Sequence, residues 1–168
     1  SRTSKGQNIV NFLQLSPEEK VSSIIQSEDF KVFKYFVMLT KQGVIKRVEM
    51  SQFNNVRRSG LIAMKLKGDD VLNWVRTSSG KDDIILATAK GQAIRFKEKN
   101  VRAMGRGASG VRAIRLKKDD VIIGIDLIPD GKAASDEQLM VVMANGFGKR
   151  TSVASYKVQG RGGSGIKT

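Results

Sequence analysis

Two short stretches of this 168-residue chain have the glycine spacing of a dinucleotide-binding loop. The stretch MGRGASG, residues 104–110, fits the pattern G-x-G-x-x-G, and QGRGGSG, residues 159–165, repeats it. Such a loop binds a pyrophosphate when a helix follows it, because the helix N-terminus supplies the N–H groups that hold the anion. Here residues 111–121 alternate with the period of a strand, three residues follow Gly165, and no P-loop ending Gly-Lys-Ser/Thr occurs. The glycines therefore predict loops that connect strands rather than a nucleotide site.

The glycine loops belong to an internal repeat that covers residues 36–71, 85–121 and 141–168. The shared hairpin glycines are Gly43, Gly91 and Gly146, and the second glycines are Gly60, Gly110 and Gly165. Repeats of this length with about four short strands indicate blades around an axis, because one blade cannot bury both of its faces. The sequence predicts an all-β fold of antiparallel four-stranded blades, about three to four in number. We expect residues 1–30 to be the tail of a preceding blade, followed by units at 31–75, 76–128 and 129–168.

Each unit begins as a β-hairpin, with its first strand expected at 36–40, 84–89 and 139–144. Asn145-Gly146 is typical of a type I′ turn, which needs positive φ at both central residues. Alternation predicts further strands at 62–66 and 111–116, each leading through an aspartate pair into an apolar run. Residues 129–138 are expected to form a solvated loop.

The segment SPEEKV, residues 16–21, admits two interpretations. Ser16, Pro17 and Glu19 have the types and spacing of a helix start. In the register of the repeat, however, Val21 aligns with Val71 and the acidic pair becomes a tight turn between strands.

The chain is strongly basic, with 30 Lys and Arg against 16 Asp and Glu and a net charge of +14. A folded domain with so much charge of one sign repels itself unless it binds a polyanion. Nucleic acid is therefore the leading partner, and an anionic membrane surface is the second. Because the chain has no Cys and no His, disulfides, structural zinc, and thiol or histidine catalysis are excluded. No apolar run reaches the roughly 20 residues of a membrane-spanning helix.

One row of cations keeps the register of the repeat. An arginine stands four residues after each hairpin glycine, at Arg47, Arg95 and Arg150, and Lys46 and Lys149 precede two of them. Scattered surface charge would not keep register, so these residues are expected on one rim of the disc, where they would contact DNA phosphates.

A second group of cations lies in and around the glycine loops. Arg106 and Arg161 lie within the loops, and the shorter loop of the first unit carries Arg57 and Arg58. Guanidinium groups beside backbone N–H groups bind phosphate oxygens and need no base contact. The remaining candidate DNA-binding residues are Lys97, Lys99, Arg102, Arg112 and Arg115.

The aromatic residues do not favour single-stranded DNA or RNA as the ligand. Such ligands stack on exposed aromatic rings placed among basic residues. Most aromatic residues here lie in apolar strand contexts, which leaves Phe147 and Tyr156 as the exposed candidates. Two rings are too few for a stacking platform, so duplex DNA is preferred over a single strand.

Two runs, GQAIRFKEKNVRAMGRGASGVRAIRL at 91–116 and ANGFGKRTSVASY at 144–156, resemble the C-terminal domains of DNA gyrase A subunits. The related A-type subunits of topoisomerase IV have a similar domain, and the resemblance covers essentially the whole chain. It implies a β-pinwheel, in which neighbouring blades exchange strands and duplex DNA bends around a basic outer rim. The signature box of the family, Gln-basic-Arg-Gly-Gly-basic-Gly, has a degenerate copy here. Its residues are Gln159, Gly160, Arg161, Gly162, Gly163, Ser164 and Gly165, with Gly160 and Ser164 in place of two cations.

The resemblance also implies a function, namely non-specific binding and wrapping of duplex DNA in support of negative supercoiling by gyrase. It implies no catalytic residue, metal or cofactor in this segment, since ATP and Mg²⁺ act through other domains and subunits of the parent enzyme. The implied partners are double-stranded DNA, the A-subunit core and the gyrase B subunit in an A2B2 assembly at the bacterial nucleoid in the cytoplasm. No membrane is involved, and the isolated segment is expected to be a monomer.

Three alternatives stay open at this point. The chain can belong to a topoisomerase IV A-type subunit, it can be a propeller-like scaffold for protein interactions, or it can bind RNA. Because it begins SRTSKG without an initiator Met, we expect it to be a segment of a longer protein.

Overall fold

The computed structural model describes residues 5–8, 11–13, 15–16, 18–25, 32–57, 59–130 and 136–168. Almost all regular structure in these residues is antiparallel β, which confirms the predicted all-β fold. The strands are β1 (Tyr35–Thr40), β2 (Val44–Glu49), β3 (Leu72–Ser78), β4 (Asp83–Thr88), β5 (Gln92–Lys97), β6 (Val111–Arg112), β7 (Ile122–Ile128), β8 (Gln138–Val142), β9 (Gly148–Ser152) and β10 (Ile166–Lys167). Single 3-10 turns, η2 (Met50–Phe53), η3 (Glu98–Asn100) and η4 (Val153–Ser155), follow β2, β5 and β9.

The three predicted hairpins are present as β1–β2, β4–β5 and β8–β9. All three close in the same way: the N–H of the hairpin glycine donates to the carbonyl three residues earlier, as Gly43 does to Thr40 at 3.0 Å. Each glycine has positive φ, +79° at Gly43 and +86° at Gly146, whereas Asn145 does not. The type I′ turn predicted at Asn145-Gly146 is therefore wrong, because only the residue that ends the loop needs the left-handed conformation.

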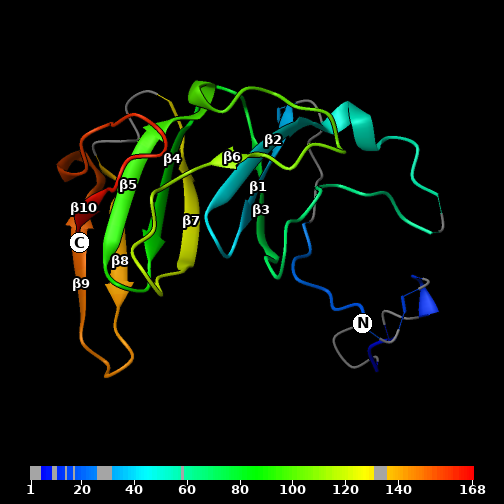
Figure 1. The fold of residues 1–168 in the computed structure, drawn as a ribbon, viewed down its shortest axis with the longest axis horizontal. Helices are drawn as coiled ribbons and strands as arrows, with labels where there is room; N and C mark the ends of the chain where they lie inside the picture. The colour runs from blue at the N-terminus through cyan, green and yellow to red at the C-terminus, as the bar shows by residue number, and fades with distance from the viewer. Residues whose placement is uncertain are drawn as a thin grey trace.

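Each of the first two blades borrows its fourth strand from the next unit in the chain. The sheet orders are β3-β1-β2-β6 and β10-β5-β4-β7, so β6 completes the blade of the first unit and β10 completes the blade of the second. The two exchanges are equivalent, since Val111 pairs with Ile45 in one blade and Ile166 pairs with Ala93 in the other. Figure 1 shows the chain leaving β5 and reaching over the neighbouring blade before it enters β6.

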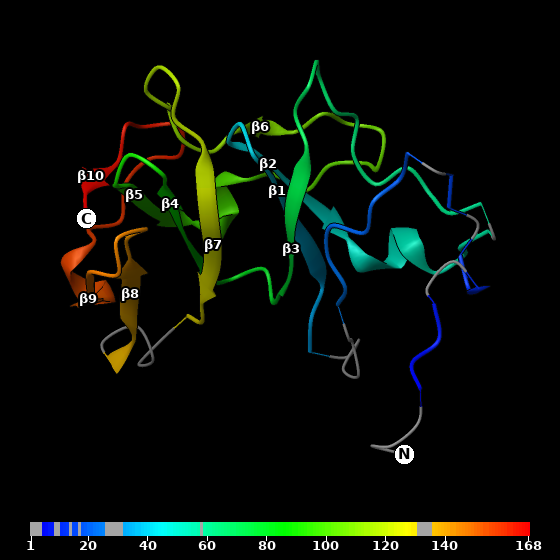
Figure 2. The same cartoon turned by 90° about the horizontal axis from the view of Figure 1, so that it is seen from below.

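The strands at the opposite edges of the two blades, β3 and β7, contact each other and lie side by side in Figure 2. Both begin directly after the aspartate pairs, as the sequence predicts. The unit boundary expected after residue 75 falls inside β3, which pairs with β1 through Ser78, so the blade continues to that residue. The third unit supplies only the hairpin β8–β9 as a sheet of its own.

The main core lies between the first two blades rather than within one of them. Leu39 and Ile45 from the first blade pack in one cluster with Leu86 and Phe96 from the second, and Ile114 from the connection after β6 joins them. Burying both facing surfaces in this way makes the blades a cooperative unit.

The second aspartate of each pair is buried and ties the connection to a hairpin turn. The Asp70 carboxylate accepts the N–H groups of Gln42 and Val71, both at 2.9 Å. Asp120 does the same for Lys90 and Val121 at 2.9 Å. These aspartates are therefore structural, and their burial removes two negative charges from the surface.

Two secondary-structure predictions need correction. Residues 62–66 form no strand, because the hairpin edge that they would pair with is not present among the described residues, and of 111–116 only β6 is a strand. In the N-terminal segment, Glu19 makes a turn in which its N–H donates to the carbonyl of Ser16 and its carboxylate accepts the Ser16 N–H. Neither a helix nor a strand follows in residues 18–25. Pro17, and residues 131–135 of the loop predicted at 129–138, lie outside the described residues.

Among the glycines of the MGRGASG stretch, Gly110 is the one that the backbone requires. Its φ is +95°, and a Cβ there would lie 2.7 Å from the carbonyl oxygen of Ile45, the residue that pairs with β6. The equivalent Gly165 would place a Cβ 2.5 Å from the carbonyl oxygen of Ala93. Gly105 has no neighbour within 4 Å of such a Cβ and no positive φ.

We expect Gly110→Ala to lower the free energy of unfolding by about 2 kcal/mol or more, through the strained φ and the overlap with the Ile45 carbonyl. Gly105→Ala, the matched control in the same loop, should leave it unchanged or slightly raised. Urea unfolding of both variants measures the difference, and equal stabilities would contradict this account of the loop.

Candidate nucleic-acid interface

After η3 and η4 the chain crosses to the preceding blade, and the residues after η2 are the equivalent segment of the first unit. We call residues 51–68, 99–118 and 154–168 crossing segments 1, 2 and 3. None of them contains an acidic residue, whereas crossing segment 2 alone contains seven Lys and Arg. The exchanged strands β6 and β10 lie within segments 2 and 3, so the segments run along the blade edges opposite β3 and β7.

Adjacent crossing segments are hydrogen-bonded to one another. The Arg115 N–H donates to the carbonyl of Gly163 at 2.8 Å, and the Gly162 N–H donates to the carbonyl of Ala113 at 2.7 Å. Segments 1 and 2 are joined by the Lys65 N–H and the Ala108 carbonyl at 3.3 Å. The three segments therefore form one continuous surface, which we call the crossing belt.

Most of the predicted loop cations face solvent on the crossing belt. Those that are exposed are Arg57, Lys99, Arg102, Arg112 and Arg115. Sequence reasoning missed other exposed cations on the same surface, namely Lys65, Lys67, Lys117, Lys118, Lys157 and Lys167. The lack of acids between each 3-10 turn and aspartate pair is the sequence signal that could have identified them. Arg58 lies outside the described residues.

The prediction that Arg47 lies on an exposed rim is wrong. Its side chain is 12% exposed and bridges the two blades: one guanidinium nitrogen lies 3.2 Å from the fully buried carboxylate of Glu98, in the next unit. The guanidinium carbon also lies 4.4 Å from the centre of the Tyr35 ring, in the geometry of a cation–π contact. Glu98 is held in turn by the Ser78 hydroxyl at 2.7 Å. Arg47 is therefore a clamp between blades.

Arg95 is buried for the same reason, because it sits at the next junction. It is 11% exposed, pairs with Asp83 at 2.7 Å and donates to the carbonyl of Val153, in the third unit, at 3.1 Å. Lys97 shares the Asp83 carboxylate at 2.8 Å and remains half-exposed, so its charge is partly neutralised. Only Arg150 and its neighbour Lys149, on β9, keep the exposure that was predicted for this row.

Lys46, also predicted to bind DNA, is completely buried and cannot contact a phosphate. Its ammonium group donates to the carbonyl of Ala63 at 2.7 Å and to the carbonyl of Arg106. Burial lowers the pKa of this ammonium below its usual value, and the nearby Arg106 charge lowers it further. Lys46 is thus an internal cation that binds two crossing segments.

Arg106 and Arg161 occupy equivalent loops but have different surroundings. The Arg161 guanidinium donates to the carbonyls of Asn100, at 3.1 Å, and Arg112, so the degenerate box at 159–165 is bound to crossing segment 2. The guanidinium of Arg106 has no hydrogen-bond acceptor or ion-pair partner among the described residues. It lines, with Arg57, an open hollow of about 590 Å³ between segments 1 and 2.

Five carboxylates are buried in the fold, whereas most described cations of the crossing belt are exposed. The buried acids are Asp70, Asp82, Asp83, Glu98 and Asp120, whereas Lys46 is the completely buried cation of the described chain. Of the exposed acids, Asp126 lies on β7, at the blade edge away from the crossing belt, whereas Asp69 and Asp119 directly follow crossing segments 1 and 2. The belt can therefore attract a polyanion along its whole length.

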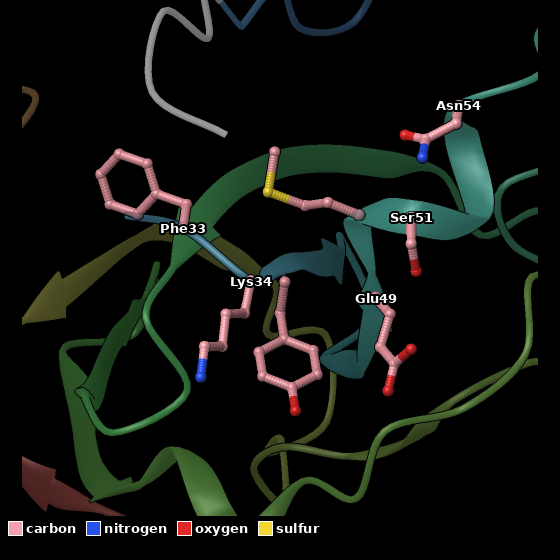
Figure 3. A pocket seen from close by; sticks show the side chains of 7 residues that line it. Phe33, Lys34, Glu49, Ser51 and Asn54 are labelled. Atoms are coloured by element: carbon pink, nitrogen blue, oxygen red, sulfur yellow. The ribbon is translucent and has the colours of Figure 1, made fainter. Parts of the chain in front are cut away.

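The pocket at the start of the first blade does not offer an alternative site. It has a volume of about 400 Å³ and is lined by Phe33, Lys34, Tyr35, Glu49, Met50, Ser51 and Asn54 (Figure 3). Lys34 and Glu49 are its charged groups. Within the described ranges, no three His, Cys, Asp or Glu side chains gather as metal ligands, and no helix is long and apolar enough to span a bilayer. Tyr156, expected to be exposed, is buried, and Phe147 is 67% exposed.

Strand-exchanging blades that carry a basic, acid-free belt define this protein as a β-pinwheel domain. The sequence profile of a family described as DNA gyrase C-terminal domain, beta-propeller, matches residues 34–79, 82–129 and 137–168. The chain belongs to this family. It is 41% identical over its whole length to the DNA gyrase A subunits of Staphylococcus epidermidis and of Staphylococcus aureus, and it spans 19% of the length of each.

Solved structures are similar throughout the chain. The crystal structure of a DNA topoisomerase IV C-terminal domain superposes with a TM-score of 0.86 at 29% identity, covering 96% of this chain and 49% of the other. A DNA gyrase A C-terminal domain gives 0.82 at 28% identity, covering 98% and 53%. The C-terminal domain of E. coli ParC, at 14% identity and a TM-score of 0.73, shares the fold.

The clamp between blades makes a prediction about stability. Arg47→Met leaves the Glu98 carboxylate buried without its counter-charge, which should cost about 3–5 kcal/mol of unfolding free energy. The double variant Arg47→Met with Glu98→Gln keeps an acceptor for Ser78 without the charge and should recover part of that loss. Urea unfolding compares the two with Arg76→Met, an exposed control on β3. A double variant less stable than the single one would rule out the clamp.

Proposed function

We propose that this chain binds duplex DNA without sequence preference and bends it around the crossing belt. The observation that carries the proposal is the belt itself: three hydrogen-bonded crossing segments with exposed cations and no acid. Lys and Arg side chains that contact phosphates supply affinity by releasing condensed counterions, and this affinity falls as salt rises. The belt offers no row of exposed aromatic residues for stacking among its described residues, which favours a duplex over a single strand.

Bending is the costly part of this function. Bending a site of 20–30 base pairs by 40–90° costs on the order of 1–6 kcal/mol. A curved row of phosphate contacts offsets that cost, as in other proteins that wrap DNA without reading bases. The exchanged strands place successive crossing segments edge to edge, so contacts can follow the DNA from one blade to the next.

In this proposal the chain is the non-catalytic, DNA-wrapping part of a gyrase A protein in the cytoplasm of a bacterium. It would present DNA to the A-subunit core of an A2B2 assembly, which also contains gyrase B, and it would thereby support negative supercoiling. ATP and Mg²⁺ would act elsewhere in that assembly, and this segment would need no cofactor. The 41% identity to gyrase A subunits favours gyrase over the topoisomerase IV alternative, whose C-terminal domain is also structurally similar.

If the crossing belt binds DNA, a charge reversal on the belt should weaken DNA binding more than the same reversal elsewhere on the surface. Arg112→Glu, on β6, removes a phosphate contact and should weaken duplex binding about tenfold at 0.1 M salt, with a salt dependence shallower by about one unit in log–log slope. Arg76→Glu, on β3 at the opposite edge of the same sheet, changes the net charge equally and should have little effect. Fluorescence anisotropy with a short duplex across a salt series makes the comparison. Equal losses would show that only net charge matters.

Wrapping, as distinct from binding, predicts a change in DNA topology. Relaxed circular DNA incubated with the domain and then closed by a nicking-closing topoisomerase should carry a signed linking-number shift that disappears as salt rises. Gel electrophoresis of the topoisomers measures it. Tight binding without a shift would reduce the chain to a DNA-binding module, and salt-insensitive binding to a protein instead would favour the scaffold alternative.

A further inference from the structure

The two junctions of the crossing belt share one backbone hydrogen bond, Lys65 to Ala108 and Arg115 to Gly163, but they differ at a second pair of equivalent positions. Between segments 2 and 3, the carbonyl of Ala113 accepts the N–H of Gly162 at 2.7 Å. The equivalent atoms between segments 1 and 2 are the Ala63 carbonyl and the Gly107 N–H, and they form no such bond. The Ala63 carbonyl instead accepts the ammonium group of Lys46, also at 2.7 Å.

The same ammonium group reaches the loop that Gly107 belongs to. Lys46 donates to the carbonyl of Arg106 as well as to that of Ala63, so one buried cation joins crossing segment 1 to crossing segment 2. The equivalent residue in the second blade is Ile94, which has no polar group to offer. Ile94 is also completely buried, and its side chain packs against Gly163 of crossing segment 3.

The difference carries over to the two loop arginines. At the junction with Ile94, the guanidinium of Arg161 donates to the carbonyls of Asn100 and Arg112 and helps to hold the segments together. At the junction with Lys46, the guanidinium of Arg106 makes no such bond within the described chain, and it lines the open hollow with Arg57. Lys46 binds the backbone of the loop, so the side chain of Arg106 is available to a ligand.

We propose that Lys46 is a positioning residue for DNA: it fixes the loop 104–110 from inside, and so presents Arg106 to a phosphate while Arg161 serves the structure. This inference rests on the proposed function. It adds that two loops at equivalent positions of the repeat have different roles, one in DNA binding and one in the structure.

The local electrostatics agree with an anionic ligand at Arg106. The charge of Arg106 is near enough to Lys46 to lower the pKa of its ammonium group, and crossing segments 1 and 2 contain no carboxylate to compensate. A phosphate bound at Arg106 would supply the missing negative charge and relieve the repulsion between the two cations.

The first test compares the two loop arginines directly. Arg106→Ala should weaken binding to a short DNA duplex about tenfold at 0.1 M salt and make the log–log salt slope shallower by about one, with an unchanged melting temperature. Arg161→Ala should lower the melting temperature and leave the slope unchanged. Equal effects of the two substitutions on DNA binding would overturn the proposal.

The second test asks whether Lys46 acts through Arg106. Lys46→Met keeps the length of the side chain without its charge, and Lys46→Ile copies the second blade. In either background, adding Arg106→Ala should cost less DNA affinity than it costs in the unchanged protein, because the Arg106 carbonyl has lost its bond to Lys46 and the Arg106 N–H keeps its bond to Gln52 alone. Met64→Leu, a change in the apolar cluster next to Ala63, is the control and should leave the full cost of Arg106→Ala.

The outcomes separate this inference from the proposed function. If Arg112→Glu weakens DNA binding and the costs of the Lys46 and Arg106 substitutions simply add, Lys46 has a structural role only and the inference fails. If Arg112→Glu has no effect either, the proposed function itself fails. Should neither Lys46 variant fold, the comparison of Arg106→Ala with Arg161→Ala still tests the different roles of the two loops, and equal effects on DNA binding overturn the inference.

Discussion

The backbone groups along the open edge of a hairpin must find partners, and in this fold the next unit of the chain supplies them. An unpaired strand edge exposes N–H and C=O groups that attract other strands. Val111 and Arg112 cover the edge of β2, and Ile166 and Lys167 cover the edge of β5. To reach that edge the chain must leave its own blade, cross its neighbour and turn at a glycine with positive φ. The crossing segments are therefore a consequence of strand exchange, and the candidate DNA surface is built from them.

Strand exchange also explains why the regular spacing of Arg47 and Arg95 led to the wrong prediction that they lie on an exposed rim. Strand exchange packs the blades side by side, so the same contact between neighbouring blades recurs once per unit. A position on an exposed outer rim would recur with the same spacing. Arg47 and Arg95 keep perfect register because each one reaches into the next unit, to Glu98 and to Val153. A sequence shows that a position recurs, but whether it recurs at a buried junction or in solvent depends on what packs against it. Charged residues are rarely buried unless paired, and here the partners come from another blade.

Local patterns predicted the elements that depend on neighbouring residues. The hairpins, the glycine that ends each turn and the strands after the aspartate pairs follow from alternation and turn chemistry. The failures concern partners that are distant in the sequence. Residues 62–66 alternate as 111–116 do, but a strand needs an edge to pair with. Tyr156 looks like a surface residue in sequence, yet it packs with Val153 and Ile85 in a small core of its own.

The chemistry of the junctions has a consequence for the charge of the crossing belt. A backbone hydrogen bond joins each pair of neighbouring segments. Segments 2 and 3 are joined in addition by the Arg161 guanidinium on two carbonyls, and segments 1 and 2 by the Lys46 ammonium on two carbonyls. A carbonyl oxygen satisfies a cation without cancelling its charge, whereas a carboxylate would cancel it. The ion pairs of the described chain lie off the belt instead: Arg47 with Glu98 joins two blades, and Asp83 pairs with Arg95 and Lys97 inside the second blade. The belt is thus held together in a way that leaves its positive charge intact, which is the property that a surface for phosphates requires.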